Sequence, residues 1–201
     1  MNDATEPPWI PSLITIDVEG THAVDSEHDD PYASVELLDK FLEMVRVPVT
    51  LFVTPDVVKQ CPETVRGWNR ENTTLGLHIH PARVEGGRSD RLGEYDREAI
   101  ERFLAAGCES FESYLGMTPT SFRAGRWEYC EQLLTALDAQ GFERDTSLKP
   151  DRAMAPYSHS GIDEYPLTVY SNVLVRLLTK PWDFEGLPLH ADAFLGNTVS
   201  A

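Results

Sequence analysis

Two histidines, His78 and His80, stand two positions apart at the end of an apolar segment. In an extended strand, side chains at positions i and i+2 point to the same face, so we expect the two imidazoles to share one face. Two imidazoles with one or two carboxylates can bind Zn²⁺ or another divalent transition metal and leave a coordination position open for water or substrate. This spacing alone leaves open a solvent-facing histidine pair.

Asp17 and Glu19 have the same spacing after another apolar segment. Burial of two neighbouring acids raises the pKa of one of them unless a cation binds between them. Beside a metal, one carboxylate can be a ligand while the other accepts a proton from water. An ordinary acidic loop is the alternative, but the two histidines in the same chain favour a metal site.

Arg123 lies in a third polar segment, Ser121-Phe-Arg-Ala-Gly-Arg-Trp127. A guanidinium at a strand end can hold a carboxylate in a fixed orientation through paired hydrogen bonds. The Ala124-Gly125 step can turn backbone N–H groups toward a developing oxyanion. A surface arginine before a helix is the alternative that this segment leaves open.

These residues need elements that bring them together. Hydrophobic periodicity and turn residues predict strands over 12–19, 48–54, 73–80, 120–124 and 142–148, and helices over 32–47, 96–115 and 128–140. Weaker strand candidates are 164–170 and 186–190. Alternating strands and helices favour a parallel sheet with helical crossovers, whose carboxyl strand ends lie at one edge. We therefore expect one site to contain the polar residues at those ends: Asp17, Glu19, His78, His80, Arg123 and Asp145.

The chain has 201 residues, which suits one domain over 1–201, with 1–11 as a flexible N-terminal segment. No apolar run approaches the roughly 20 residues of a membrane-spanning helix. The first residues lack the basic and apolar regions of a secretory signal, and three distant cysteines do not suggest a disulfide framework. We therefore expect a cytoplasmic protein.

The chain is strongly acidic, with 33 Asp and Glu against 17 Lys and Arg and a formal net charge of −16. Such a charge argues against nucleic-acid and membrane-surface partners, because both are anionic. An acid-rich, lysine-poor composition is typical of proteins adapted to concentrated salt, where screening relieves self-repulsion. An ordinary acidic protein remains the alternative, and the oligomeric state is not predicted.

The order and spacing of five motifs over residues 12–150 resemble the polysaccharide deacetylases of carbohydrate esterase family 4. The motifs are Leu13-Ile-Thr-Ile-Asp-Val-Glu-Gly20, Val47-Pro-Val-Thr-Leu-Phe-Val53, Leu75-Gly-Leu-His-Ile-His-Pro81, Phe122-Arg-Ala-Gly125 and Gly141-Phe-Glu-Arg-Asp-Thr-Ser147. The resemblance implies an α/β fold, a distorted (β/α)7 barrel that is complete or lacks its last strand. It also implies metal-dependent removal of acetyl groups from N-acetylated sugars.

The resemblance also implies roles for single residues. Asp17 would be the general base that activates water, Glu19 and His78 would be metal ligands, and Arg123 would orient the base. Asp145 would belong to the supporting polar network. The N–H of Arg126 would bind the oxyanion. Independently of the resemblance, Trp127 is a candidate for sugar contact, because aromatic rings bind the apolar faces of sugars and it lies close to Arg123 in the sequence.

Three departures from the family pattern leave choices open. Val18 separates two acids that are usually adjacent, so Asp17 and Glu19 could exchange roles. Position 82 is alanine where the second metal histidine is usual, so His80 must take its place. His190 is the best match to the late histidine that acts as general acid, although 180–184 is a competing alignment without histidine.

The sequence therefore predicts a metal-dependent hydrolase that removes N-acetyl groups from a carbohydrate substrate. The expected cofactor is a divalent metal, zinc first, with cobalt or nickel as alternatives. Two other functions stay open: a hydrolase of small cyclic amides on the same fold, and an inactive member that binds glycan or metal.

Overall fold

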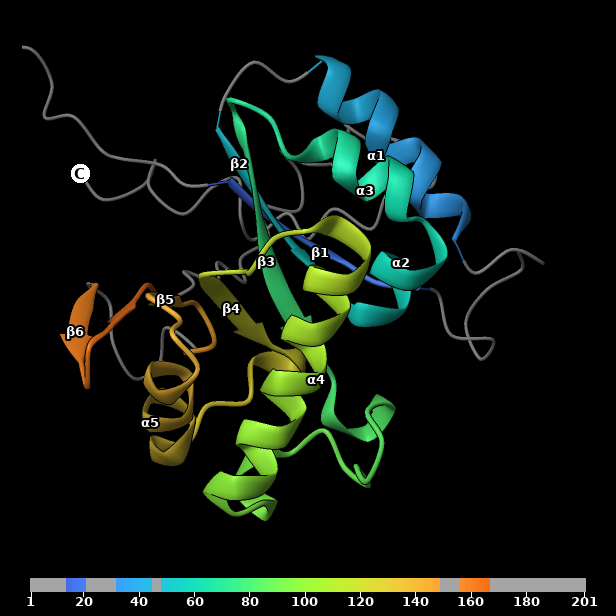
Figure 1. The fold of residues 1–201 in the computed structure, drawn as a ribbon. Helices are drawn as coiled ribbons and strands as arrows, with labels where there is room; N and C mark the ends of the chain where they lie inside the picture. The colour runs from blue at the N-terminus through green and yellow to red at the C-terminus, as the bar shows by residue number, and fades with distance from the viewer. Residues whose placement is uncertain (1–13, 21–31, 45–47, 149–155, 167–201) are drawn as a thin grey trace, which may run out of the picture.

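A seven-stranded sheet lies at the centre of the structure (Figure 1). The computed structural model describes residues 14–20, 32–44, 48–148 and 156–166. The strands are β1 (Ile14–Val18), β2 (Val49–Val53), β3 (Thr73–Ile79), β4 (Ser121–Ala124), β5 (Arg144–Asp145), β6 (Tyr157–His159) and β7 (Ile162–Glu164). Their order is β1-β2-β3-β4-β5-β7-β6, and all neighbours are parallel except β6 and β7. The expected α/β fold is confirmed, and over the described residues the sheet is open.

Helices connect the parallel strands and cover the sheet. They are α1 (Ala33–Met44), α2 (Pro55–Gln60), α3 (Pro62–Trp68), α4 (Arg97–Leu115) and α5 (Glu131–Ala139), with 3-10 turns at Pro81–Arg83, Leu92–Glu94 and Gly125–Trp127. Local chemistry sets both ends of α4. The Asp96 carboxylate accepts a hydrogen bond from the Ala99 N–H at 2.8 Å, and Gly116 ends the helix with a φ of 68°.

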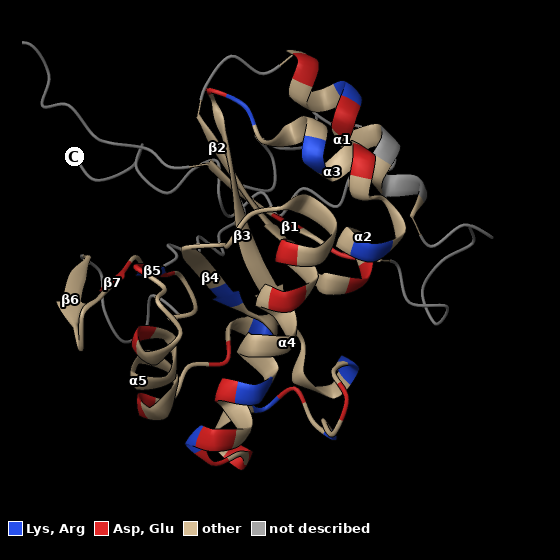
Figure 2. Cartoon of the chain, viewed as in Figure 1, with Lys and Arg blue, Asp and Glu red and all other residues tan. Residues whose placement is uncertain are grey.

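The main core lies between α4 and the middle of the sheet. Ile100, Leu104 and Phe111 of α4 are fully buried, as are most side chains of β2 and β3. Gly107 lets α4 approach β3 closely, because a Cβ at this position would lie 2.7 Å from a Leu77 methyl carbon. The strands carry few charged residues, while the helices and loops carry many (Figure 2). Strands of a parallel sheet that is covered by helices are expected to be uncharged in this way.

The five strands and three helices that periodicity predicted most clearly are present, with differences at their ends. The strand expected over 142–148 pairs only at Arg144–Asp145, and the helix expected over 128–140 begins at Glu131 because residues 125–127 form a 3-10 turn. Of the strand candidate 164–170, Glu164 is the last residue of β7, which forms a hairpin with β6, and residues 167–170 lie outside the described residues. That hairpin was not predicted, since its strands have three residues each and too little periodicity to detect. Segments 1–11 and 186–190 lie outside the described residues.

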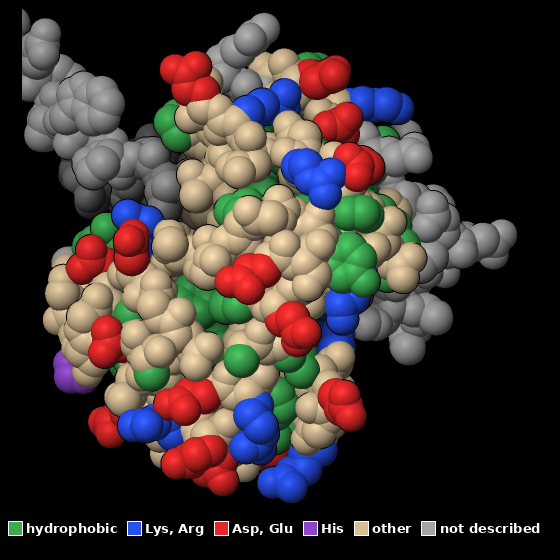
Figure 3. All heavy atoms as spheres, in the orientation of Figure 1, with side chains coloured by type: hydrophobic (Ala, Val, Ile, Leu, Met, Phe, Trp, Pro, Cys, Tyr) green, Lys and Arg blue, Asp and Glu red, His purple; other side chains and the backbone are tan. Residues whose placement is uncertain are grey.

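The surface shown in Figure 3 mixes acidic and basic side chains across the same face. Among the described residues, no helix is both long and apolar enough to cross a lipid bilayer.

Candidate metal centre

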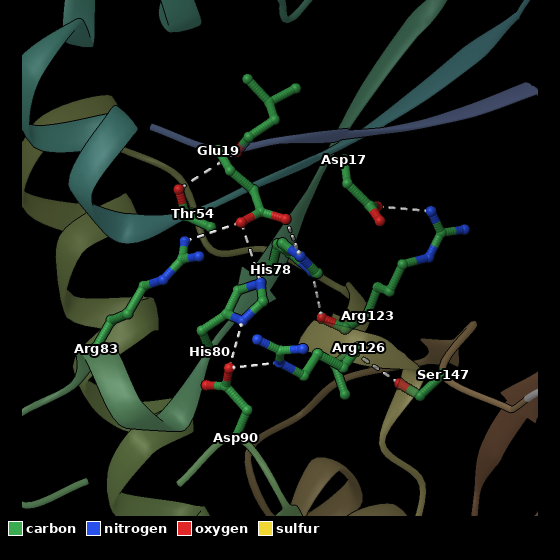
Figure 4. A network of polar contacts seen from close by, with 12 residues as sticks. Asp17, Glu19, Thr54, His78, His80, Arg83, Asp90, Arg123, Arg126 and Ser147 are labelled. Atoms are coloured by element: carbon green, nitrogen blue, oxygen red, sulfur yellow. Dashed lines mark hydrogen bonds and ion pairs between the residues drawn. The ribbon is translucent and has the colours of Figure 1, made fainter. Parts of the chain in front are cut away.

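The carboxyl ends of the parallel strands deliver polar residues to one edge of the sheet. Asp17 and Glu19 come from the end of β1, His78 and His80 from the end of β3, and Arg123 from the end of β4. The strand register places His78 directly beside Arg123. Figure 4 shows these side chains gathered in one polar network. The structure thus brings together residues that are up to 106 positions apart in the chain.

Glu19, His78 and His80 form the group among the described residues that could hold a metal ion. Their candidate ligand atoms all lie within 4.8 Å of one another. His78 Nε2 is 3.3 Å from Glu19 Oε1, and His80 Nε2 is 3.1 Å from Glu19 Oε2. Both imidazoles are buried, and their rings meet edge to face with centroids 5.0 Å apart. Two nitrogens and one carboxylate therefore converge on one point.

The other nitrogen of each imidazole shows where its proton lies. His78 Nδ1 is 2.8 Å from the carbonyl oxygen of Arg123, which can only accept a hydrogen bond. His80 Nδ1 is 3.2 Å from Oδ2 of Asp90. Each Nδ1 can therefore donate to its acceptor, and with a metal bound each Nε2 atom would present its lone pair to the ion.

Both Nε2 atoms face the carboxylate of Glu19, which can also only accept, and His78 Nε2 lies at hydrogen-bond distance from Glu19 Oε1. His80 Nε2 is buried, and no side chain or backbone group that the structure describes forms a hydrogen bond with it. The ion-pair distance of 3.1 Å to Glu19 lacks hydrogen-bond geometry. Such an arrangement needs a cation, either protons on the imidazoles or a metal ion at their centre.

The pKa shifts of these groups have the same cause. Burial opposes ionisation of Glu19, but the adjacent imidazoles of His78 and His80 outweigh it and hold the pKa of Glu19 well below its usual range. Burial lowers the pKa of His80, but the adjacent negative charge of Glu19 raises it overall. Two imidazoles and a carboxylate with a fourth position open match the ligand set of catalytic zinc sites. The donor set therefore fits a divalent transition metal.

Beside this group, Arg123 holds Asp17 in place. Its guanidinium donates from Nη1 to Asp17 Oδ1 at 2.6 Å, from Nη2 to Thr15 Oγ1 at 2.7 Å and from Nε to Thr146 Oγ1 at 2.8 Å. The Arg123 side chain is almost fully buried and lies over the ring of Phe52. Because three partners fix the guanidinium, the orientation of the Asp17 carboxylate is fixed as well.

The turn after β4 lies against the metal-site histidines. A Cβ at Gly125 would lie 2.6 Å from Nδ1 of His80, so only glycine fits there. Arg126 and Trp127 both have a left-handed backbone, with φ of 57° and 52°. Such a conformation is costly for non-glycine residues and often marks a functional turn. Trp127 is half-buried, and the Arg126 guanidinium reaches Oδ2 of Asp90 at 2.9 Å.

Asp145 lies in a second buried acidic pair, opposite Glu164 in the register of β5 and β7. Asp145 Oδ1 accepts hydrogen bonds from the N–H and hydroxyl of Ser147, and Glu164 Oε1 accepts one from the Leu148 N–H. The other oxygen of each acid is buried without a donor among the described residues. Burial raises the pKa of Asp145, and burial with the nearby Asp145 charge raises the pKa of Glu164 to about 9. The two carboxyls therefore share a proton at neutral pH.

Ser147 joins this acidic pair to β4. Its hydroxyl donates to Asp145 and accepts a hydrogen bond from the N–H of Ala124 at 2.8 Å. Asp145 is thus part of the polar support behind Arg123.

Three charged residues of this region were not predicted. Asp90 contacts His80, Arg83 donates to Glu19 Oε2 at 2.8 Å, and Glu164 pairs with Asp145. None of the three had a usable signal in the local sequence, and the burial that places Glu164 on the inner face of β7 comes from the folded structure. His190, the predicted late histidine, lies outside the described residues.

No protein-family model and no curated protein matches this sequence. Solved structures do match. A protein from Mycobacterium smegmatis assigned as a polysaccharide deacetylase has a TM-score of 0.59 at 17% identity, covering 94% of this chain and 76% of its own. A family 4 carbohydrate esterase from Streptomyces lividans has a TM-score of 0.51 at 16% identity, covering 67% of this chain and 60% of its own.

The α-amylase AmyC from Thermotoga maritima matches with a TM-score of 0.50 at 10% identity, over 77% of this chain and 45% of its own. This third likeness shows that the fold alone does not determine the reaction. At these identities the comparisons concern architecture, and the resemblance seen in the sequence motifs is confirmed at that level. The chain has the fold of the polysaccharide deacetylases and family 4 carbohydrate esterases.

Proposed function

We propose that this protein is a metal-dependent hydrolase that removes N-acetyl groups from a carbohydrate. The observation that carries the proposal is the convergence of Glu19, His78 and His80 within 4.8 Å, next to an Asp17–Arg123 pair. The fold shared with carbohydrate deacetylases supports this choice of reaction.

Glu19, His78 and His80 would hold the metal, with zinc as the first choice and cobalt or nickel as alternatives. A divalent ion there supplies Lewis acidity, which polarises the substrate carbonyl and makes a nearby water more acidic. Asp17 accepts the proton of the attacking water as general base, and its ion pair with Arg123 holds the carboxylate in one orientation. Because Val18 separates Asp17 from Glu19, the alternative to test is that the two acids exchange the roles of general base and metal ligand.

Attack of water on the amide carbonyl produces a tetrahedral oxyanion, and the C–N bond then breaks to release acetate and the sugar amine. The N–H of Arg126, in its left-handed turn, is the proposed donor to the oxyanion. Trp127 is the proposed ring for sugar contact, and Asp145 supports the turn through Ser147 and Ala124. The leaving amine needs a proton, for which His190 is the proposed donor.

The test begins with metal content, measured by elemental analysis of protein purified in high salt without chelator. Near-stoichiometric metal is expected in the wild type and its loss in His78→Ala. His159→Ala is the matched control, because His159 is an exposed histidine on β6. Metal retained in His78→Ala, or lost equally in both variants, would contradict the site.

Acetate release is then measured with N-acetylglucosamine oligomers, and ring opening with small cyclic imides. Acetate release that requires the metal supports the proposal. Activity only on cyclic substrates would identify the cyclic-amide hydrolase. Stoichiometric metal with no turnover on either class would identify an inactive binding protein.

A further inference from the structure

Asp90 contacts the buried imidazole of His80 from the side opposite the metal site. It lies in the loop between β3 and α4, and its Oδ2 atom is 3.2 Å from His80 Nδ1 (Figure 4). The same oxygen accepts from Arg126 Nε at 2.9 Å, and Oδ1 accepts from the Ala82 N–H at 3.3 Å. Both oxygens of Asp90 therefore have donors, so its carboxylate is held in one orientation.

The two histidines of the site are oriented by different kinds of group. His78 donates from Nδ1 to a backbone carbonyl, that of Arg123, which no substitution removes directly. His80 donates from Nδ1 to the side chain of Asp90. A carboxylate behind a metal-binding imidazole fixes its tautomer and increases the basicity of the ligating nitrogen.

The surroundings of His80 leave its ring little other freedom. Gly125 lies against the ring face so closely that a Cβ would be 2.6 Å from Nδ1, and His78 meets the ring at an angle of 89°. Packing therefore restricts where the ring lies, but packing does not choose which nitrogen carries the proton. That choice depends on the acceptors at the two nitrogens, Asp90 at Nδ1 and Glu19 at Nε2.

We infer that Asp90 is a positioning residue for the metal centre: it keeps the proton of His80 on Nδ1 and so leaves the Nε2 lone pair directed at the metal. This inference rests on the proposed metal site. Arg126 and the Ala82 N–H hold Asp90 itself in place. Asp90 also links His80 to the turn that carries the proposed oxyanion donor.

The test compares Asp90→Asn and Asp90→Ala with Glu85→Gln. Glu85 is exposed in the same loop, and its substitution removes the same charge. Zinc affinity is measured by competition titration at constant pH and salt. We expect about 10- to 100-fold weaker zinc binding in Asp90→Ala, a smaller loss in Asp90→Asn, which keeps an acceptor oxygen, and unchanged binding in Glu85→Gln.

A second readout does not require metal. The ring ¹⁵N shifts of His80 are recorded at pH 9 in chelator-treated protein, where the neutral tautomers are resolved. We expect the Nδ1–H tautomer in the wild type and a shift toward Nε2–H in Asp90→Ala. His78 is the internal reference, because its backbone acceptor is unchanged.

The outcomes separate this inference from the proposed function. If wild-type protein binds neither zinc, cobalt nor nickel, the metal site is wrong, and the ¹⁵N shifts still decide whether Asp90 sets the tautomer. An unchanged His80 tautomer in Asp90→Ala overturns the inference, even when zinc binding is weaker. Should Asp90→Ala fail to fold, the ring ¹⁵N shifts of His80 are recorded in Asp90→Leu, which removes the acceptor and keeps a similar volume, and an unchanged tautomer in it would overturn the inference.

Discussion

Replacement of Glu164 by glutamine is expected to weaken the pH dependence of the free energy of unfolding. Glu164 is fully buried, and its pKa is raised to about 9 by burial and by Asp145. In the unfolded chain the pKa of a glutamate is about 4.3. Between these two values the folded protein keeps a proton that the unfolded chain releases, so the free energy of unfolding falls as the pH rises.

The magnitude follows from this difference in bound protons. The stabilisation is fully present below the unfolded pKa and is lost progressively up to the folded pKa, at about 1.4 kcal/mol per pH unit. From pH 6 to pH 8 the wild type should lose up to about 3 kcal/mol through this group. The glutamine side chain of Glu164→Gln cannot lose a proton, and its amide can still donate to Asp145 Oδ2. Glu164→Gln should therefore gain about that amount relative to the wild type over the same range.

The assay is urea unfolding of both proteins at pH 6, 7 and 8 in the same salt concentration. Comparison of the two slopes cancels the contributions of groups that both proteins share. Glu109→Gln is the control, since Glu109 is exposed on α4 and is solvated whether or not the chain is folded. Equal pH slopes for wild type and Glu164→Gln would refute the shared proton.

Three further predictions concern the metal centre. Asp17→Asn should keep the bound metal and reduce turnover by about 10²- to 10⁴-fold, measured as acetate release, because the variant lacks the proposed general base; a fully active variant would place the base elsewhere. Gly125→Ala should weaken zinc binding by about tenfold or more, since the added Cβ would lie 2.6 Å from Nδ1 of His80 and displace the ring. Wild-type affinity in a zinc titration would show that the backbone of the turn moves and the His80 ring stays in place. Zinc affinity should fall as the pH is lowered from 8 to 6, because Glu19 raises the pKa of His80 and protons then compete with the metal. Calorimetry in two buffers should also detect the release of protons when zinc binds. A zinc affinity that does not depend on pH, without proton release, would contradict this prediction.

The main elements and the positions of most site residues could be predicted because their signals are local. The apolar runs of β1, β2 and β3 end in Asp17, Thr54 and His78 within a few residues of each strand's limit. Asp96 and Gly116 mark the ends of α4 through their own backbone and side-chain chemistry. Once the strands are taken as parallel, their carboxyl ends must meet at one edge, so the candidate site follows from the pattern alone.

The short elements at the end of the described chain could not be predicted in the same way. β5 has two residues, while β6 and β7 have three each. A strand of this length has no detectable period and exists because a neighbouring strand supplies its hydrogen bonds. The segment 142–148 is a strand only where Arg144 and Asp145 meet β4 on one side and β7 on the other.

The pairing of charges was decided by the tertiary structure. In a chain with 33 acidic residues, nothing in the local sequence distinguishes Asp90 or Glu164 from the other carboxylates. The side chain of Asp90 is held by its contacts with His80 and Arg126. Glu164 retains a proton because it is buried beside Asp145, which raises its pKa. Sequence determined which chemical groups reach the edge of the sheet, because strand ends are set by neighbouring residues. Only the folded chain determined which atoms meet there, because electrostatic energies depend on distance and burial between residues remote in sequence.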